Sequence, residues 1–110
     1  MAKEAEVTAT IAAHNTFTSW ISPKAMLNVN DAHVKFLNLS IGGTWAGTVT
    51  VQRRFSSTDT ERDVTDGSFV STDATVVEKA LYDHEQGVEY RIGIKTGDYT
   101  SGSCSVRLGA

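Results

Sequence analysis

The side chains best able to do chemistry in this sequence are three histidines and a single cysteine. His14, His33 and His84 lie far apart along the chain, without the short spacing that zinc sites use. The sequence has neither a G-x-S-x-G segment nor a reactive cysteine context, so it does not indicate a nucleophile activated by a base. Cys104 falls at an inward position of an alternating segment, which predicts a small buried side chain. We therefore expect no catalytic residue, no metal and no cofactor.

An acidic run is the other candidate for chemistry, with acids at near-alternate positions: Asp59, Glu61, Asp63 and Asp66. A calcium loop of the EF-hand type needs glycine at its sixth position and glutamate at its twelfth. Counting from Asp59, these positions hold Val64 and Val70. We interpret the run as a solvated loop whose carboxylates face a basic surface on a partner.

Aromatic side chains offer a further kind of site. Exposed rings could form a stacking surface for glycans, and four residues are candidates: Trp20, Trp45, Tyr82 and Tyr99. Core and rim positions explain four aromatics in a domain of this size more simply. For Trp20 in particular, the usual burial of tryptophan predicts a cover over the core, with an anchor for a partner as the alternative.

The totals limit the classes of function. With 110 residues, the chain fits one domain that can bury a core without disulfides, and its single cysteine suits a reducing cytosol. A net charge of -3 gives no basic footprint for nucleic acid. The segment Met1–Val7 carries two acids and no apolar run, so we expect neither a signal peptide nor a membrane anchor. Neither nucleic acid nor membrane is therefore an expected partner.

The elements that must position these residues are predicted by alternation. In Gly87–Lys95, apolar and polar residues alternate, which is typical of a strand with one dry and one wet face. The segment Gly47–Phe55 is its expected antiparallel partner, with Val49, Val51 and Phe55 on the buried face. Arg53 breaks the pattern. Either its aliphatic stem covers the edge of the core, or a bulge at Arg53–Arg54 shifts the register.

Further short strands are expected over 7–13, 27–29, 33–41, 62–65, 68–70, 74–81 and 103–108. At 74–81, a single helical turn is the alternative to a strand. Gly42–Gly43–Thr44 predicts a hairpin, and Asp66–Gly67 a turn. About seven to nine strands at this spacing predict an antiparallel β-sandwich over residues 7–110, after a loose lead-in at 1–6. An immunoglobulin-like sandwich is the first expectation, because the loop before Tyr90 resembles a tyrosine corner. A jelly roll is the alternative.

Four segments carry a resemblance to a known family. They read GTVTVQRRF at 47–55, GVEYRIGI at 87–94, GDYTSG at 97–102 and VRL at 106–108. This pattern resembles the small β-sandwich virion proteins of tailed bacteriophages, in which a "GTVTLQRSF"-like strand precedes a "GVxYRIGVxxGDYTSG"-like segment and a short "VRL" ending. The match covers roughly residues 37–108. The chain departs from the family at 56–64, where related sequences often place a tryptophan.

The resemblance implies a structural component of a phage particle that is made in the host cytoplasm and then resides in the virion. A capsid decoration, or cementing, protein on the outer head is the first expectation. A tail, neck or fibre-associated domain is the second, and a carbohydrate-binding adhesion module is the third. The implied partners are the major capsid protein or other virion proteins, further copies of the chain, and glycans. The candidate partner contacts are Lys3, Glu4, Trp20, Asp59, Glu61, Asp63 and Asp66.

Overall fold

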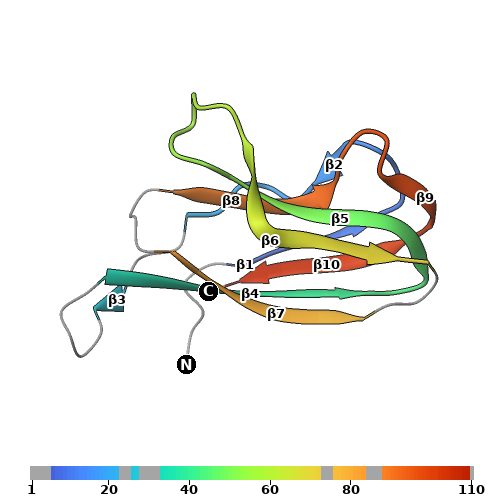
Figure 1. Ribbon diagram of the computed structural model, residues 1–110, viewed down its shortest axis with the longest axis horizontal. Helices are drawn as coiled ribbons and strands as arrows, with labels where there is room; N and C mark the ends of the chain where they lie inside the picture. Colours follow the sequence, from blue (N-terminus) through green and yellow to red (C-terminus); the bar gives the residue numbers. More distant parts are fainter. Residues whose placement is uncertain (1–5, 23–25, 28–32, 73–75, 84–87, 110) are drawn as a thin grey trace.

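The computed structural model describes residues 6–22, 26–27, 33–72, 76–83 and 88–109, and these residues form ten β-strands and no helix (Figure 1). None of them lies in a helix that could span a membrane. In chain order the strands are β1 Glu6–Ile11, β2 Thr16–Phe17, β3 Met26–Leu27, β4 His33–Gly42, β5 Trp45–Arg54, β6 Arg62–Ser71, β7 Val77–Asp83, β8 Glu89–Ile94, β9 Tyr99–Gly102 and β10 Cys104–Gly109.

The strands form two sheets that face each other (Figure 1). Sheet 1 has the order β1-β10-β4-β7, and the short β3 pairs with the first residues of β4. Sheet 2 has the order β2-β8-β5-β6, and β9 pairs with the first residues of β5. All of these pairings are antiparallel. The predicted antiparallel β-sandwich is therefore confirmed.

The inward positions of both sheets form one hydrophobic core. On β8 these positions hold Tyr90, Ile92 and Ile94, as the alternation predicts. The central strands of sheet 1 contribute the fully or almost fully buried Leu37, Leu39, Ile41, Cys104, Val106 and Leu108. Trp45, at the start of β5, is only 1% exposed and is the largest fully buried side chain. Trp20 is partly exposed and stacks on polar side chains of sheet 2, so its interpretation as a core cover is wrong.

The predicted pairing of the two most regular segments is confirmed. Residues Thr50–Arg54 of β5 pair without a break with Glu89–Gly93 of β8, and Arg53 lies opposite Tyr90. The bulge expected at Arg53–Arg54 is therefore absent from this pairing. Arg53 is instead only partly exposed, and its guanidinium lies 5.6 Å from the centroid of the Phe55 ring. This position agrees with a stem that covers the edge of the core.

A register irregularity occurs instead between β5 and β6. Residues 64–67 of β6 face Val51 alone, between the pairs Thr50↔Ser68 and Gln52↔Asp63. The predicted turn at Asp66–Gly67 is therefore wrong, because both residues belong to one bulged strand. Gly67 is buried, and a Cβ on it would lie 3.0 Å from the carbonyl oxygen of Val64, so the bulge favours glycine there.

The connection Gly42–Gly43–Thr44 joins two sheets and is not a hairpin. Its flanking strands, β4 and β5, belong to sheet 1 and sheet 2 respectively. Gly43 has a φ of +100°, and a Cβ on it would lie 2.7 Å from the carbonyl oxygen of Ser103. Glycines supply the positive φ of a tight turn, but the burial of each strand decides which strands then pair.

The N-terminal boundary also shifts slightly. Strand β1 begins at Glu6, opposite Gly109 of β10, one residue before the predicted start. The rest of the predicted lead-in, including Lys3 and Glu4, lies outside the described residues. The C-terminal strand, expected over 103–108, is β10 at Cys104–Gly109. It lies between β1 and β4 in sheet 1.

Candidate functional site

The outer face of sheet 2 carries two aromatic rings and two guanidinium groups. The Arg91 guanidinium on β8 lies 3.9 Å from the Phe17 ring centroid and 4.6 Å from that of Trp20. The Arg54 guanidinium on β5 lies 4.2 Å from the Trp20 centroid. We call these four residues the arginine–aromatic stack. Such contacts contribute roughly 0.5 to 2 kcal/mol each. The stack therefore holds the segment around β2 against the sheet.

A buried amide connects this stack to the acidic run. Gln52 is 6% exposed, and its Oε1 accepts hydrogen bonds from Arg91 Nε at 3.0 Å and Nη2 at 2.8 Å. Gln52 Nε2 donates to Asp63 Oδ1 at 3.1 Å, and Lys95 Nζ donates to Asp63 Oδ2 at 2.7 Å. The bond from Lys95 is the main cause that lowers the pKa of Asp63, and it raises the pKa of Lys95. Desolvation lowers the pKa of Arg91.

The acids predicted to face a partner are engaged within the chain. Asp63 binds Lys95, and a Glu61 oxygen lies 3.9 Å from Arg91 Nη2. Asp59 accepts a hydrogen bond from Arg62 at 2.6 Å, which is the main cause that lowers the pKa of Asp59. These three carboxylates therefore do not form an uncompensated acidic surface. The structure describes the backbone of Asp66 but not its side chain.

The residues between β5 and β6 form a structured loop, which we call the β5–β6 loop (residues 55–61). Asp59 Oδ2 accepts the backbone N–H of Phe55 at 3.0 Å, and the Asp59 N–H donates to the Ser56 carbonyl at 3.1 Å. Figure 1 shows this connection rising above β8, on the side of sheet 2 that faces away from sheet 1. The Phe55 ring is 43% exposed, with the Arg62 guanidinium 5.1 Å from its centroid. Its predicted core-facing position is wrong, because β5 ends at Arg54.

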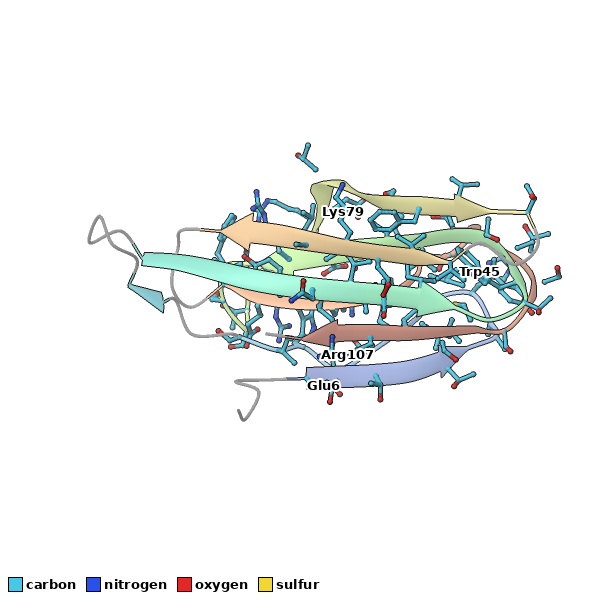
Figure 2. The ribbon with its side chains drawn as sticks, turned by 90° about the horizontal axis from the view of Figure 1, so that it is seen from below. Glu6, Trp45, Lys79 and Arg107 are labelled. Carbon is cyan, nitrogen blue, oxygen red and sulfur yellow. The ribbon has the colours of Figure 1, made fainter. Side chains whose placement is uncertain are left out.

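The outer face of sheet 1 contains a groove of about 650 Å³. Its lining includes Thr8, Ser40 and Ser105 on neighbouring strands, and Arg107 lies between Thr8 and Ser40 in the register. Figure 2 shows this face, with Glu6 and Arg107 on the adjacent strands β1 and β10, where they form an ion pair. Other residues lining the groove are Thr10, Gly42, Val76 and Glu78. The side chain of Val76 is 72% exposed.

The histidine and cysteine of the described part have structural surroundings. His14 Nδ1 accepts the N–H groups of Gly97 at 3.1 Å and Tyr99 at 3.3 Å, so His14 orders the turn before β9. The structure does not describe His84 or the side chain of His33. Cys104 is fully buried, as predicted, and burial raises the pKa of its thiol. No cluster of His, Cys, Asp or Glu suited to a metal ion occurs within the described residues.

The four aromatic residues considered for a glycan surface do not all lie on the surface. Trp45 lies in the core, and the Tyr99 hydroxyl donates to the Gly102 carbonyl at 2.9 Å. Trp20 is already stacked on two arginines, and the structure describes the backbone of Tyr82 but not its side chain. A platform that includes Trp45 is therefore excluded.

Comparison with known proteins leaves the fold as the main guide. No protein-family model matches the chain, and no curated protein matches it. Among solved structures, it is similar to a chain described as "Crystal Structure of FeII HppE", with 11% sequence identity and a TM-score of 0.30. The alignment covers 86% of this chain and 42% of that one, so this chain spans less than half the length of that structure. A likeness this weak carries no argument about activity.

Proposed function

We propose that the protein is a non-enzymatic structural component of a bacteriophage particle, and that among the roles in this class it decorates the capsid. We also propose that its sandwich is a jelly roll. The functional proposal rests on the positions, in the fold, of the segments that resemble virion proteins. The segments 47–55, 87–94 and 97–102 correspond to β5, β8 and β9 with the turn before it. Strand β5 pairs with both β8 and β9. Segments that are separate in the sequence thus make up one continuous part of sheet 2.

The strand order supports the jelly roll over the immunoglobulin-like alternative. In an immunoglobulin-like sandwich, the first two strands share a sheet, and so do the last two. Here β1 and β2 lie in different sheets, as do the last two strands, β9 and β10. The first strand instead pairs with the last, and β2 pairs with β8, which is the wrapping of a jelly roll. Viral capsid proteins and lectins use this architecture.

A decoration protein needs only a surface that recognises the assembled shell. Binding to the shell but not to its dissociated subunits stabilises the shell by the free energy of that binding, repeated over many sites. The major capsid protein is the partner that this role implies.

The test compares phage particles assembled with and without the protein during heating or chelation. Particles with the protein should release DNA at a higher temperature than particles without it. Equal release temperatures would rule out cementing. Imaging of the particles gives the second readout, because density on the capsomers supports decoration. Density on the tail or neck would instead support the second expected role.

A further inference from the structure

The β5–β6 loop has the properties of an interface anchor. Its Phe55 ring is 43% exposed, although aromatic rings usually bury most of their area. The hydrogen bonds of Asp59 fix the loop before any partner binds. A preordered loop loses little conformational entropy on binding, so an exposed aromatic ring on it can contribute strongly to affinity.

The groove on sheet 1 has the complementary properties. Its volume of about 650 Å³ lies in the range of roughly 300 to 1,000 Å³ typical of binding pockets. Its lining includes several small hydroxyl-bearing side chains and the exposed Val76. The lining also includes two charged side chains, Arg107 and the exposed Glu78. Arg107 is compensated by its ion pair with Glu6, which leaves Glu78 as the charge that a ligand could pair with. An apolar ring with a neighbouring cation is therefore the kind of group that the groove fits.

We propose that copies of this protein bind head to tail, with the β5–β6 loop of one copy inserted into the sheet 1 groove of the next. Phe55 occupies the hollow beside Val76. The guanidinium of Arg62 pairs with Asp59 of its own loop and lies 5.1 Å from the Phe55 ring centroid. Because its side chain is still 52% exposed, it also faces Glu78 of the neighbouring copy in this contact. Opposite charges at such a contact fix the orientation of the two copies and favour encounter.

The positions of loop and groove make the contact intermolecular. The loop follows the Arg54 end of β5, whereas Gly42 of the groove lies just before the Trp45 end. A ten-residue strand spans about 30 Å, so one copy does not fill its own groove with its own loop. A head-to-tail contact closes into a ring or continues as a filament. The inference does not depend on the proposed virion role, because it concerns the isolated protein.

Sedimentation velocity of the purified protein over a range of concentrations tests the contact. The wild-type protein should form species larger than a dimer as its concentration rises. Phe55→Ala should weaken this association at least about tenfold, since truncation of an interface anchor has effects of this size. Val70→Ala is the matched control, because Val70 is 68% exposed on β6 and lies outside the groove. It should leave the association unchanged.

A mixing experiment distinguishes head-to-tail binding from any symmetric contact. Ser105→Trp places a bulky ring in the groove from an exposed position of β10. At a concentration where the wild-type protein just associates, Ser105→Trp and Phe55→Ala should each remain monomeric when alone. Mixed in equal amounts, they should form dimers that grow no further, because only one intact loop and one intact groove remain. Circular dichroism and thermal unfolding verify that both variants are folded.

Several results would overturn the proposal: a wild-type protein that stays monomeric at millimolar concentration, equal association of Phe55→Ala and wild type, or variants that do not combine on mixing. Each of these can occur whether or not the protein stabilises phage particles. Failure of this contact is therefore distinguishable from failure of the proposed function.

Discussion

Arg91 shows how one side chain can hold several elements together. Its guanidinium stacks on rings from two positions of the chain before β3 and donates two hydrogen bonds to a buried amide of β5. The group is planar and presents several donors in one fixed plane, so it makes both kinds of contact at once. A lysine at the same position keeps the charge but loses the stacking and the paired hydrogen bonds.

Arg91→Lys should therefore reduce the free energy of unfolding by about 1 to 3 kcal/mol, as expected when a buried acceptor such as Gln52 loses its donors. Arg107→Lys is the control, because Arg107 forms a surface ion pair with Glu6. Its cost should stay below about 1 kcal/mol. Urea unfolding of both variants measures the difference. Equal losses in the two variants would show that the stack adds nothing beyond an ordinary ion pair.

The sequence predicted some residue roles and missed others for a clear reason. Alternation correctly placed Cys104 inward, because successive side chains of a strand point to opposite faces of the sheet. The stack could not be predicted in the same way. It depends on Phe17 and Trp20 lying over β8, and nothing local in the sequence specifies that β2 pairs with β8.

At the scale of elements, the two sheet-crossing glycines behave differently although they are adjacent. Gly43 has a positive φ and lies against the backbone of Ser103, the residue just before β10. Gly42 has no heavy atom within 4 Å of an added Cβ and is not among the glycines with positive φ. The crossing between the sheets therefore depends on Gly43 and hardly on Gly42.

We expect Gly43→Ala to destabilise the protein by about 1 to 3 kcal/mol, from backbone strain together with the contact at the Ser103 carbonyl. Gly42→Ala should change the free energy of unfolding by less than about 1 kcal/mol. Chemical denaturation of both variants tests this pair. A Gly43→Ala variant as stable as Gly42→Ala would mean that the turn relaxes without cost and does not constrain the crossing.

The same connection shows why strand pairing was harder to predict than strand position. The Gly-Gly signal correctly located a tight turn, but tight turns serve hairpins and sheet crossings alike. The choice depends on which faces of β4 and β5 become buried, and both strands present one apolar face. Only the packing of the two sheets resolves this choice.

At the scale of the whole molecule, the fold class followed from the sequence but the candidate interaction surfaces did not. Many short alternating segments allow little other than a β-sandwich. The groove, by contrast, brings together residues of β1, β4, β7 and β10, which become neighbours only after the chain wraps. Phe55 continued the alternation of β5 and so predicted a core position, because the sequence did not reveal where the strand ends.

The pH dependence of stability should reflect the ion pair between Asp63 and Lys95, which connects β6 to the residue that follows β8. The pKa of Asp63 is lowered on folding, so its contribution is present above the ordinary value of 3.8 and is lost as pH falls through the folded value. The pKa of Lys95 is raised, so its contribution is present below 10.5 and is lost as pH rises through the folded value.

Asp63→Asn should therefore flatten both the acidic and the alkaline limbs of the stability profile, because it removes the charge that shifts each pKa. The side chains of Asp63 and Lys95 are 43% and 37% exposed, so screening should hold the loss at neutral pH below about 1 kcal/mol. Urea unfolding across the pH range gives both limbs, and high salt should shrink the difference between variant and wild type. An acidic limb unchanged by Asp63→Asn would assign the acid sensitivity to other carboxylates, of which Asp59 beside Arg62 is the first to test.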